Sequence, residues 1–108
     1  MNPELLNRIR IGLQPWKEHI EEKRMFGGTC FLYKGKMCIG ETKGRLVVRV
    51  INKKMRKILT SPFVSPMDFT GKPMKEFIFV QMDGFSSEEQ LQQFVELGIE
   101  HAKSKTEI

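Results

Sequence analysis

The sequence has only two cysteines and no long apolar run. Cys30 and Cys38 are too few for a disulfide scaffold, and their spacing matches no zinc signature, so we expect two buried free thiols. No apolar stretch approaches the roughly 18 residues that a membrane-spanning helix needs. The first residues also lack the basic and apolar regions of a signal peptide. These absences predict a cytoplasmic protein that makes no membrane contact.

Patterns typical of catalysis or metal binding are missing as well. The two histidines, His19 and His101, are far apart, and neither has the spacing that would place two ligands on one helix face. Ser61 and Ser65 have no neighbouring residue pattern that would activate a nucleophile. Most carboxylates fall in segments typical of solvated helix faces, although folding could bring some together. We therefore expect no metal, no cofactor and no enzymatic activity.

The length and composition are those of one ordinary globular domain. A chain of 108 residues is long enough for one core and too short for two, so we assign residues 1–108 to a single domain. The hydrophobic fraction is 40% and the charged fraction 29%, which predicts an independently folding chain. The net charge of +5 allows an acidic partner but does not require one.

Periodicity and turn residues predict a chain that alternates helices with strands. Residues between Trp16 and Lys23 fit either a short helical turn or the start of a strand. A capping box of Ser86 and Glu89 predicts the start of the last helix. The expected elements are a helix from Asn2 to about Leu13, strands Cys30–Tyr33, Lys36–Ile39 and Arg45–Ile51, a helix Lys53–Leu59 capped by Asn52, an ordered loop Phe63–Lys75, a strand Lys75–Met82 and a final helix.

This order predicts an α+β fold, a two-layer sandwich. It consists of an antiparallel sheet of four to five strands with the helices on one face, in the order helix, three strands, short helix, one or two strands, helix. A two-residue turn at Lys34-Gly35 would place Cys30, Leu32, Met37 and Ile39 on one sheet face. Cys38 would then lie on the opposite face beside Phe31.

The sheet face without helices is expected to be unusually apolar. A solvated face should alternate apolar with polar residues, yet this one would display several large apolar side chains, among them Phe31, Tyr33, Val47 and Ile51. Such a patch usually marks an interface, which predicts a protein partner and allows a homodimer. The alternative is that the segment Phe63–Met74 folds back over this face, and the sequence leaves both open.

One basic run is a candidate for nucleic-acid contact. Its cations, Lys53, Lys54, Arg56 and Lys57, stand near the start of a predicted helix, where the helix dipole disfavours positive charge. The run has no interleaved aromatic side chains on which bases could stack, so we favour a solvated basic face. Nucleic-acid binding stays the alternative.

Four short motifs resemble the N-terminal domain of the TfoX/Sxy family of competence regulators. They comprise Met25, Phe26, Gly27 and Gly28; Gly35, Lys36 and Met37; the strand around Arg49; and Gly71, Pro73, Met74 and Lys75. The paired glycines could cradle a phosphate, but they do not open a helix, so we interpret them as a tight bend.

The resemblance implies a fold like that of secretion chaperones and a small non-catalytic regulatory or adaptor module. Family regulators act on competence genes together with the cyclic-AMP receptor protein. They also carry a second domain of helix-hairpin-helix character, which this sequence is expected to lack because it ends at Ile108. An alternative is a small-ligand binder or enzyme accessory protein that uses a cavity beneath the motif at residues 71–74.

Overall fold

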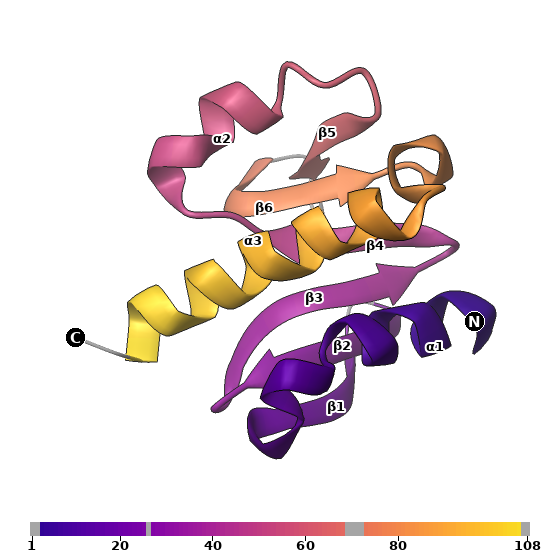
Figure 1. The fold of residues 1–108 in the computed structure, drawn as a ribbon. Helices are drawn as coiled ribbons and strands as arrows, with labels where there is room; N and C mark the ends of the chain where they lie inside the picture. Colours follow the sequence, from indigo (N-terminus) through magenta and orange to yellow (C-terminus); the bar gives the residue numbers. More distant parts are fainter. Residues whose placement is uncertain (1–2, 26, 69–72, 107–108) are drawn as a thin grey trace.

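The chain folds into one six-stranded antiparallel sheet with helices packed on one of its faces (Figure 1). The computed structural model describes residues 3–25, 27–68 and 73–106. In chain order the elements are α1 (Pro3–Gly12), the 3-10 helix η1 (Gln14–His19), β1 (Ile20–Met25), β2 (Gly28–Tyr33), β3 (Lys36–Thr42), β4 (Arg45–Arg49), α2 (Asn52–Ile58), β5 (Val64–Asp68), β6 (Pro73–Val80), the 3-10 helix η2 (Met82–Phe85) and α3 (Glu88–Thr106). The α+β two-layer sandwich expected from the sequence is therefore confirmed.

The strand order across the sheet is β1-β2-β3-β4-β6-β5, so β1 and β5 form its edges. The sheet has six strands rather than the expected four to five, because two segments outside the predicted strands, β1 and β5, pair with their neighbours. The ambiguous region after Trp16 contains both a 3-10 helix and the edge strand β1. The expected loop at 63–75 is wrong in part, since Val64–Asp68 pairs with β6 as β5; residues 69–72 lie outside the described residues.

The turn between β2 and β3 has the predicted two-residue geometry. Tyr33 pairs with Lys36 and Leu32 with Met37, while Lys34 and Gly35 have φ angles of 49° and 84°. Two positive φ angles in succession match the twist of a hairpin, and glycine at the second position adopts such an angle without a side-chain clash. The turn thus fixes the start of the register as the sequence predicted.

A β-bulge then changes which face the next residues occupy. Phe31 pairs with Ile39 and Leu32 with Met37, which leaves Cys38 as the extra residue on β3. Cys38 and Ile39 consequently both lie on the helix side, so the expected grouping of Ile39 with Met37 is wrong. The two cysteines are free and buried, on opposite faces as predicted.

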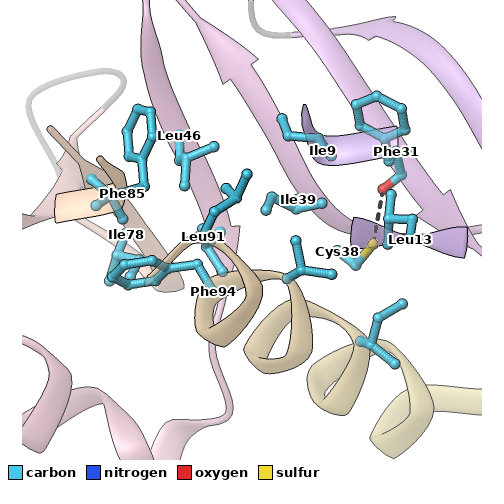
Figure 2. Packing of buried hydrophobic residues seen from close by; sticks show 14 of the residues in the cluster. Ile9, Leu13, Phe31, Cys38, Ile39, Leu46, Ile78, Phe85, Leu91 and Phe94 are labelled. Carbon is cyan, nitrogen blue, oxygen red and sulfur yellow. Dashed lines mark hydrogen bonds between the residues drawn. The ribbon is translucent and has the colours of Figure 1, made fainter. Parts of the chain in front are cut away.

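The main core lies between the sheet and two helices, α1 and α3 (Figure 2). Ile9 and Leu13 come from the first helical segment, Leu91 and Phe94 from α3, and they pack against strand residues such as Ile39. α3 lies very close to β3, because a Cβ added at Gly98 would come within 2.3 Å of the Cys38 carbonyl oxygen. Apolar burial on this face is what fixes the two helices on the sheet.

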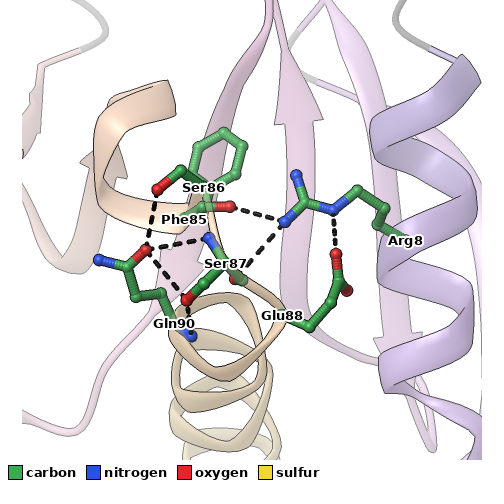
Figure 3. A network of polar contacts seen from close by, with 6 residues as sticks. All are labelled: Arg8, Phe85, Ser86, Ser87, Glu88 and Gln90. Carbon is green, nitrogen blue, oxygen red and sulfur yellow. Dashed lines mark hydrogen bonds and ion pairs between the residues drawn. The ribbon is translucent and has the colours of Figure 1, made fainter.

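A capping box starts α3, one residue later than predicted (Figure 3). Ser87 Oγ accepts a hydrogen bond from the Gln90 N–H at 3.1 Å, and Gln90 Oε1 accepts one from the Ser87 N–H at 3.0 Å. Arg8 of α1 joins this junction, donating from Nε to Glu88 at 2.8 Å and from Nη2 to the Phe85 carbonyl at 2.7 Å. Both helices are thereby tied together at the same end of the sheet.

Candidate functional site

A polar cluster surrounds Glu76 of β6. Its carboxylate accepts a hydrogen bond from the backbone N–H of Asn52 at 3.2 Å, at the first residue of α2, and its carbonyl oxygen accepts one from the Val50 N–H at 3.0 Å. Ile51 is thus the N-cap residue of α2, and the predicted cap at Asn52 is wrong. Glu76 has φ of 63°, a left-handed conformation that costs a non-glycine residue energy.

Side chains from β4 and α3 complete this Glu76 cluster. His101 Nε2 lies 3.2 Å from Glu76 Oε1 and 3.2 Å from Arg49 Nη2. Lys105 Nζ lies 3.8 Å from the same carboxylate oxygen. The cluster joins the end of β4 and the starts of α2 and β6 to the last turns of α3.

The protonation of His101 follows from its two neighbours. The Glu76 carboxylate only accepts hydrogen bonds and Arg49 only donates them, so Nε2 bonds to Glu76 when it carries a proton and to Arg49 when it does not. Nδ1 is buried without a partner among the described residues, so a proton there, in the other tautomer or in the cation, would leave an unpaired N–H in the interior. We therefore assign the neutral tautomer with the proton on Nε2, donated to Glu76.

The pKa values in the cluster shift in consistent directions. Burial lowers the pKa of His101 below its ordinary 6.5, and the hydrogen bond to Glu76 opposes this only in part. The same hydrogen bond lowers the pKa of Glu76 below 4.5, with a further contribution from Lys105. Burial also lowers the pKa of Arg49. At neutral pH the cluster therefore holds a carboxylate, a neutral imidazole and two cations.

Acid–base catalysis needs the imidazole to reach a substrate, and His101 is only 1% exposed. The contacts of the Glu76 cluster join β4, α2 and β6 to α3. The sequence carries no signal for the cluster, because its members are separated by up to 56 positions, from Arg49 to Lys105, and match no short motif. Among the described residues, no three His, Cys, Asp or Glu side chains are grouped as a metal site would require.

The predicted basic run lies on the exposed side of α2. Lys53, Lys54, Arg56 and Lys57 are all exposed, while Met55 and Ile58 pack against the core. Lys54 is held by Glu100 of α3, with Nζ 2.9 Å from the carboxylate oxygen. No ion pair within the described part of the chain involves the other three cations. The structure thus presents three uncompensated charges on one short helix.

The predicted apolar interface is not an exposed patch. Phe31 and Tyr33 belong to the helix-side core and are 0% and 3% exposed, so their assignment to the opposite face is wrong. Val47 does lie on the second face, but it is 1% exposed. Ile51 is half-buried at the start of α2. Whether the chain pairs with itself stays a prediction.

A second apolar cluster fills this other face of the sheet. Arg45 and Arg49 of β4 stack over the rings of Phe79 and Phe77, with guanidinium carbons 3.9 and 4.1 Å from the ring centroids. Met67 of β5 is fully buried in the cluster, and because β5 is itself a strand of the sheet it extends this face. Whether the segment Phe63–Met74 folds back over the face stays a prediction, since residues 69–72 lie outside the described residues. The members are Cys30, Leu32, Met37, Val47, Met67, Phe77 and Phe79, with Met25 packed against them.

A groove runs beside the edge strand β1 on the helix side of the sheet. Two hollows of about 390 and 240 Å³ form it, and both are bordered by Arg10 and Glu22. These two side chains form an ion pair with N–O distances of 2.8 and 2.9 Å. We call this surface the edge groove; its other lining residues are Leu13, Gln14, Lys17, Ile20 and Phe31 in the larger hollow and Leu6, Lys23, Arg24 and Thr29 in the smaller one.

The motif residues mark turns and strand ends. Met25 ends β1 and pairs with Gly28, where an added Cβ would come within 1.8 Å of the Glu41 carbonyl oxygen, so the paired glycines serve the predicted tight bend. Phe26 and Gly71 lie outside the described residues, as does Lys72 in the segment 71–74 proposed to cover a ligand cavity. The remaining motif positions are Gly27, Gly35, Lys36, Met37, Arg49, Pro73, Met74 and Lys75, at the hairpin turns, in β3 and β4 and at the start of β6.

The chain is similar to a known protein family over most of its length. The model of the TfoX N-terminal domain matches residues 12–102, a span that contains all six strands and most of α3. No curated protein matches the chain. No helix within the described ranges is long and apolar enough to cross a membrane.

Proposed function

The chain belongs to the TfoX N-terminal domain family, and from this premise we propose that it is a non-catalytic regulatory module that acts through protein contacts in the cytoplasm. The match over residues 12–102 carries the proposal, because it supports a module of the competence-regulator kind and spans the whole sheet. The partner is another protein or a second copy of the chain.

One structural feature supports a role in binding another protein rather than in catalysis. The imidazole of the Glu76 cluster is buried, whereas the edge groove is open and lies beside β1, an edge of the described sheet. Exposed sheet edges and adjacent grooves are surfaces that proteins use to bind one another. The edge groove is accordingly the surface that we assign to the contact.

Transcript measurements in the source bacterium test the proposal. Deletion of the gene is expected to change transcript levels of DNA-uptake genes, and the wild-type chain supplied in trans is expected to restore them. As a control, the gene is restored with a variant that changes Ile11 to Gln, since Ile11 is exposed and lines neither hollow of the groove. Unchanged DNA-uptake transcripts, together with an altered set of small metabolites, would instead favour an enzyme accessory or ligand-binding role.

A second candidate function is weak DNA binding through α2. The observation that favours it is the exposure of Lys53, Arg56 and Lys57 without ion-pair partners in the described ranges. Sequence-independent binding of this kind depends on phosphate contacts and is sensitive to salt. A gel-shift titration at several salt concentrations tests it.

A further inference from the structure

We propose that the edge groove binds an extended acidic segment of a partner protein, which pairs with β1 as an added strand. This inference rests on the proposed function, because it specifies the kind of partner that the regulatory module contacts. Addition of a strand to a sheet edge draws affinity from main-chain hydrogen bonds and specificity from pockets for alternate side chains. The edge of β1 offers both.

The main-chain groups of β1 are available in a defined alternation. The Lys34 N–H donates to the His19 carbonyl at 2.9 Å, so the backbone of His19 faces β2. Because the direction of these groups alternates along an antiparallel strand, Glu22 and Arg24 direct their N–H and C=O groups away from β2. β1 is an edge of the described sheet, so these groups meet no further strand there.

The hollows of the edge groove match the spacing of an added strand. Ile20 and Glu22 border the larger hollow, and Glu22 and Arg24 border the smaller one. Side chains on one face of a strand recur every two residues, about 7 Å apart. An added strand would therefore direct successive side chains of one face toward the two hollows, on either side of the Arg10–Glu22 ion pair.

The charged residues that line the two hollows define the partner. Arg10 neutralises Glu22, and this hydrogen bond lowers the pKa of Glu22, which keeps the pair ionised. The remaining charged lining residues are the cations Lys17, Lys23 and Arg24. An acidic segment complements this excess of positive charge, and a basic segment is repelled.

The lining also specifies where an apolar residue belongs. Leu13, Ile20 and Phe31 line the larger hollow, whereas Arg24 lies at the smaller one. In an antiparallel added strand, the residue opposite Ile20 and the residue opposite Arg24 lie four positions apart, as these two do in β1. The partner segment therefore carries an apolar residue at one position and an acidic residue four positions earlier.

Charged side chains on an edge strand can also serve only to prevent sheets from pairing edge to edge. That role requires repulsion of any added strand, regardless of its charge. The two accounts differ in what an acidic strand does: general protection predicts no binding, whereas the edge groove predicts binding that depends on charge. A peptide of defined sequence separates them.

The probe is a short fluorescent peptide rich in threonine, with a leucine and, four positions earlier, a glutamate. Fluorescence anisotropy with the full chain is expected to give a dissociation constant in the micromolar range. The same peptide with lysine in place of glutamate is expected to bind about fivefold more weakly, as the loss of one cross-strand ion pair implies. Arg24→Glu should reverse this order, so that the lysine peptide becomes the better ligand.

Backbone pairing is tested without changing the protein. N-methylation of alternate residues along the edge of the peptide that faces β1 should abolish binding, while N-methylation along its other edge should leave binding intact. In the protein, Arg24→Pro removes an N–H that β2 does not use, and Arg24→Gln is its control because it removes the charge and keeps the N–H. The Pro variant should lose the peptide and the Gln variant should only weaken it.

Three results would overturn the inference. One is no binding of the glutamate peptide at millimolar concentration. Another is equal binding of the two N-methylated peptides. The third is a dimer in sedimentation that Arg24→Pro dissociates, since the occupant of the edge would then be a second copy of the chain. If Arg24→Pro binds no peptide yet restores DNA-uptake transcripts in the deletion strain, the chain regulates these genes without using the edge groove.

Discussion

At the scale of single residues, Glu76 shows how side-chain contacts can hold a residue in a strained backbone conformation. Its φ of 63° suits glycine, yet its carboxylate reaches the first N–H of α2 and the imidazole of His101. We expect Glu76→Gly to be more stable than Glu76→Ala by about 1 kcal/mol, because both lose the carboxylate and only glycine relieves the strain. Urea unfolding of the two variants measures this difference, and an alanine variant at least as stable as the glycine variant would contradict it.

The lowered pKa of His101 makes stability depend on pH in a predictable direction. Below about pH 6.5 the unfolded chain binds a proton that the folded chain does not, so the free energy of unfolding should decrease as the pH falls from that point. The lowered pKa of Glu76 extends the loss below pH 4.5. Urea unfolding at several pH values should show the decrease in the wild type.

Two variants identify the histidine that is responsible for this pH dependence. His101→Gln should remove the decrease just below pH 6.5, because no imidazole is then left to protonate in the interior. His19→Gln is the matched control, since His19 is exposed in η1, and it should keep the decrease. A profile that is the same in the wild type and in His101→Gln would show that another group is responsible.

At the scale of elements, the start of α3 depends on one hydroxyl. Ser87 Oγ accepts the Gln90 N–H, whereas within the described part of the chain Ser86 Oγ bonds only to the Gln90 side chain, at 3.1 Å. Ser87→Ala should therefore lower the free energy of unfolding by about 1 kcal/mol, and Ser86→Ala by clearly less. Equal effects in chemical denaturation would mean that the capping assignment is wrong.

The elements also show what the sequence could and could not predict. Glycine at a turn, such as Gly35, adopts the positive φ angle that a two-residue hairpin needs, so the sequence predicts the hairpin and its pairing. The bulge at Cys38 has no sequence signal, and it moved Ile39 to the helix side. The edge strand β1 was ambiguous because its charged residues show no apolar alternation. The Glu76 cluster depends on contacts between distant segments, which periodicity cannot reveal.

At the scale of the whole molecule, the burial of Val47 reverses an expectation about assembly. A patch exposed on the second face would have allowed Val47→Glu to yield folded monomers. Since Val47 is 1% exposed among apolar neighbours, the new charge should lower the free energy of unfolding by several kcal/mol, on the order of 3. Ile11→Glu, at an exposed position of α1, is the control and should fold normally.

Sedimentation and urea unfolding of the two variants separate the alternatives for the second face. A Val47→Glu chain with wild-type stability, monomeric where the wild type is dimeric, would restore this face as an interface.

The basic surface of α2 predicts weak, salt-dependent DNA binding at most. With Lys54 held by Glu100, three free cations remain, and neutralising about three phosphates gives a salt slope near −2.7, or about a fortyfold loss of affinity between 50 and 200 mM salt. The double variant Lys53→Glu, Lys57→Glu should abolish this binding in a gel-shift titration. The control Lys36→Glu, Lys43→Glu changes the net charge equally at two exposed hairpin positions and should weaken binding much less. Tight binding that persists at 200 mM salt and disappears only in the α2 variant would make DNA contact the primary function of this module.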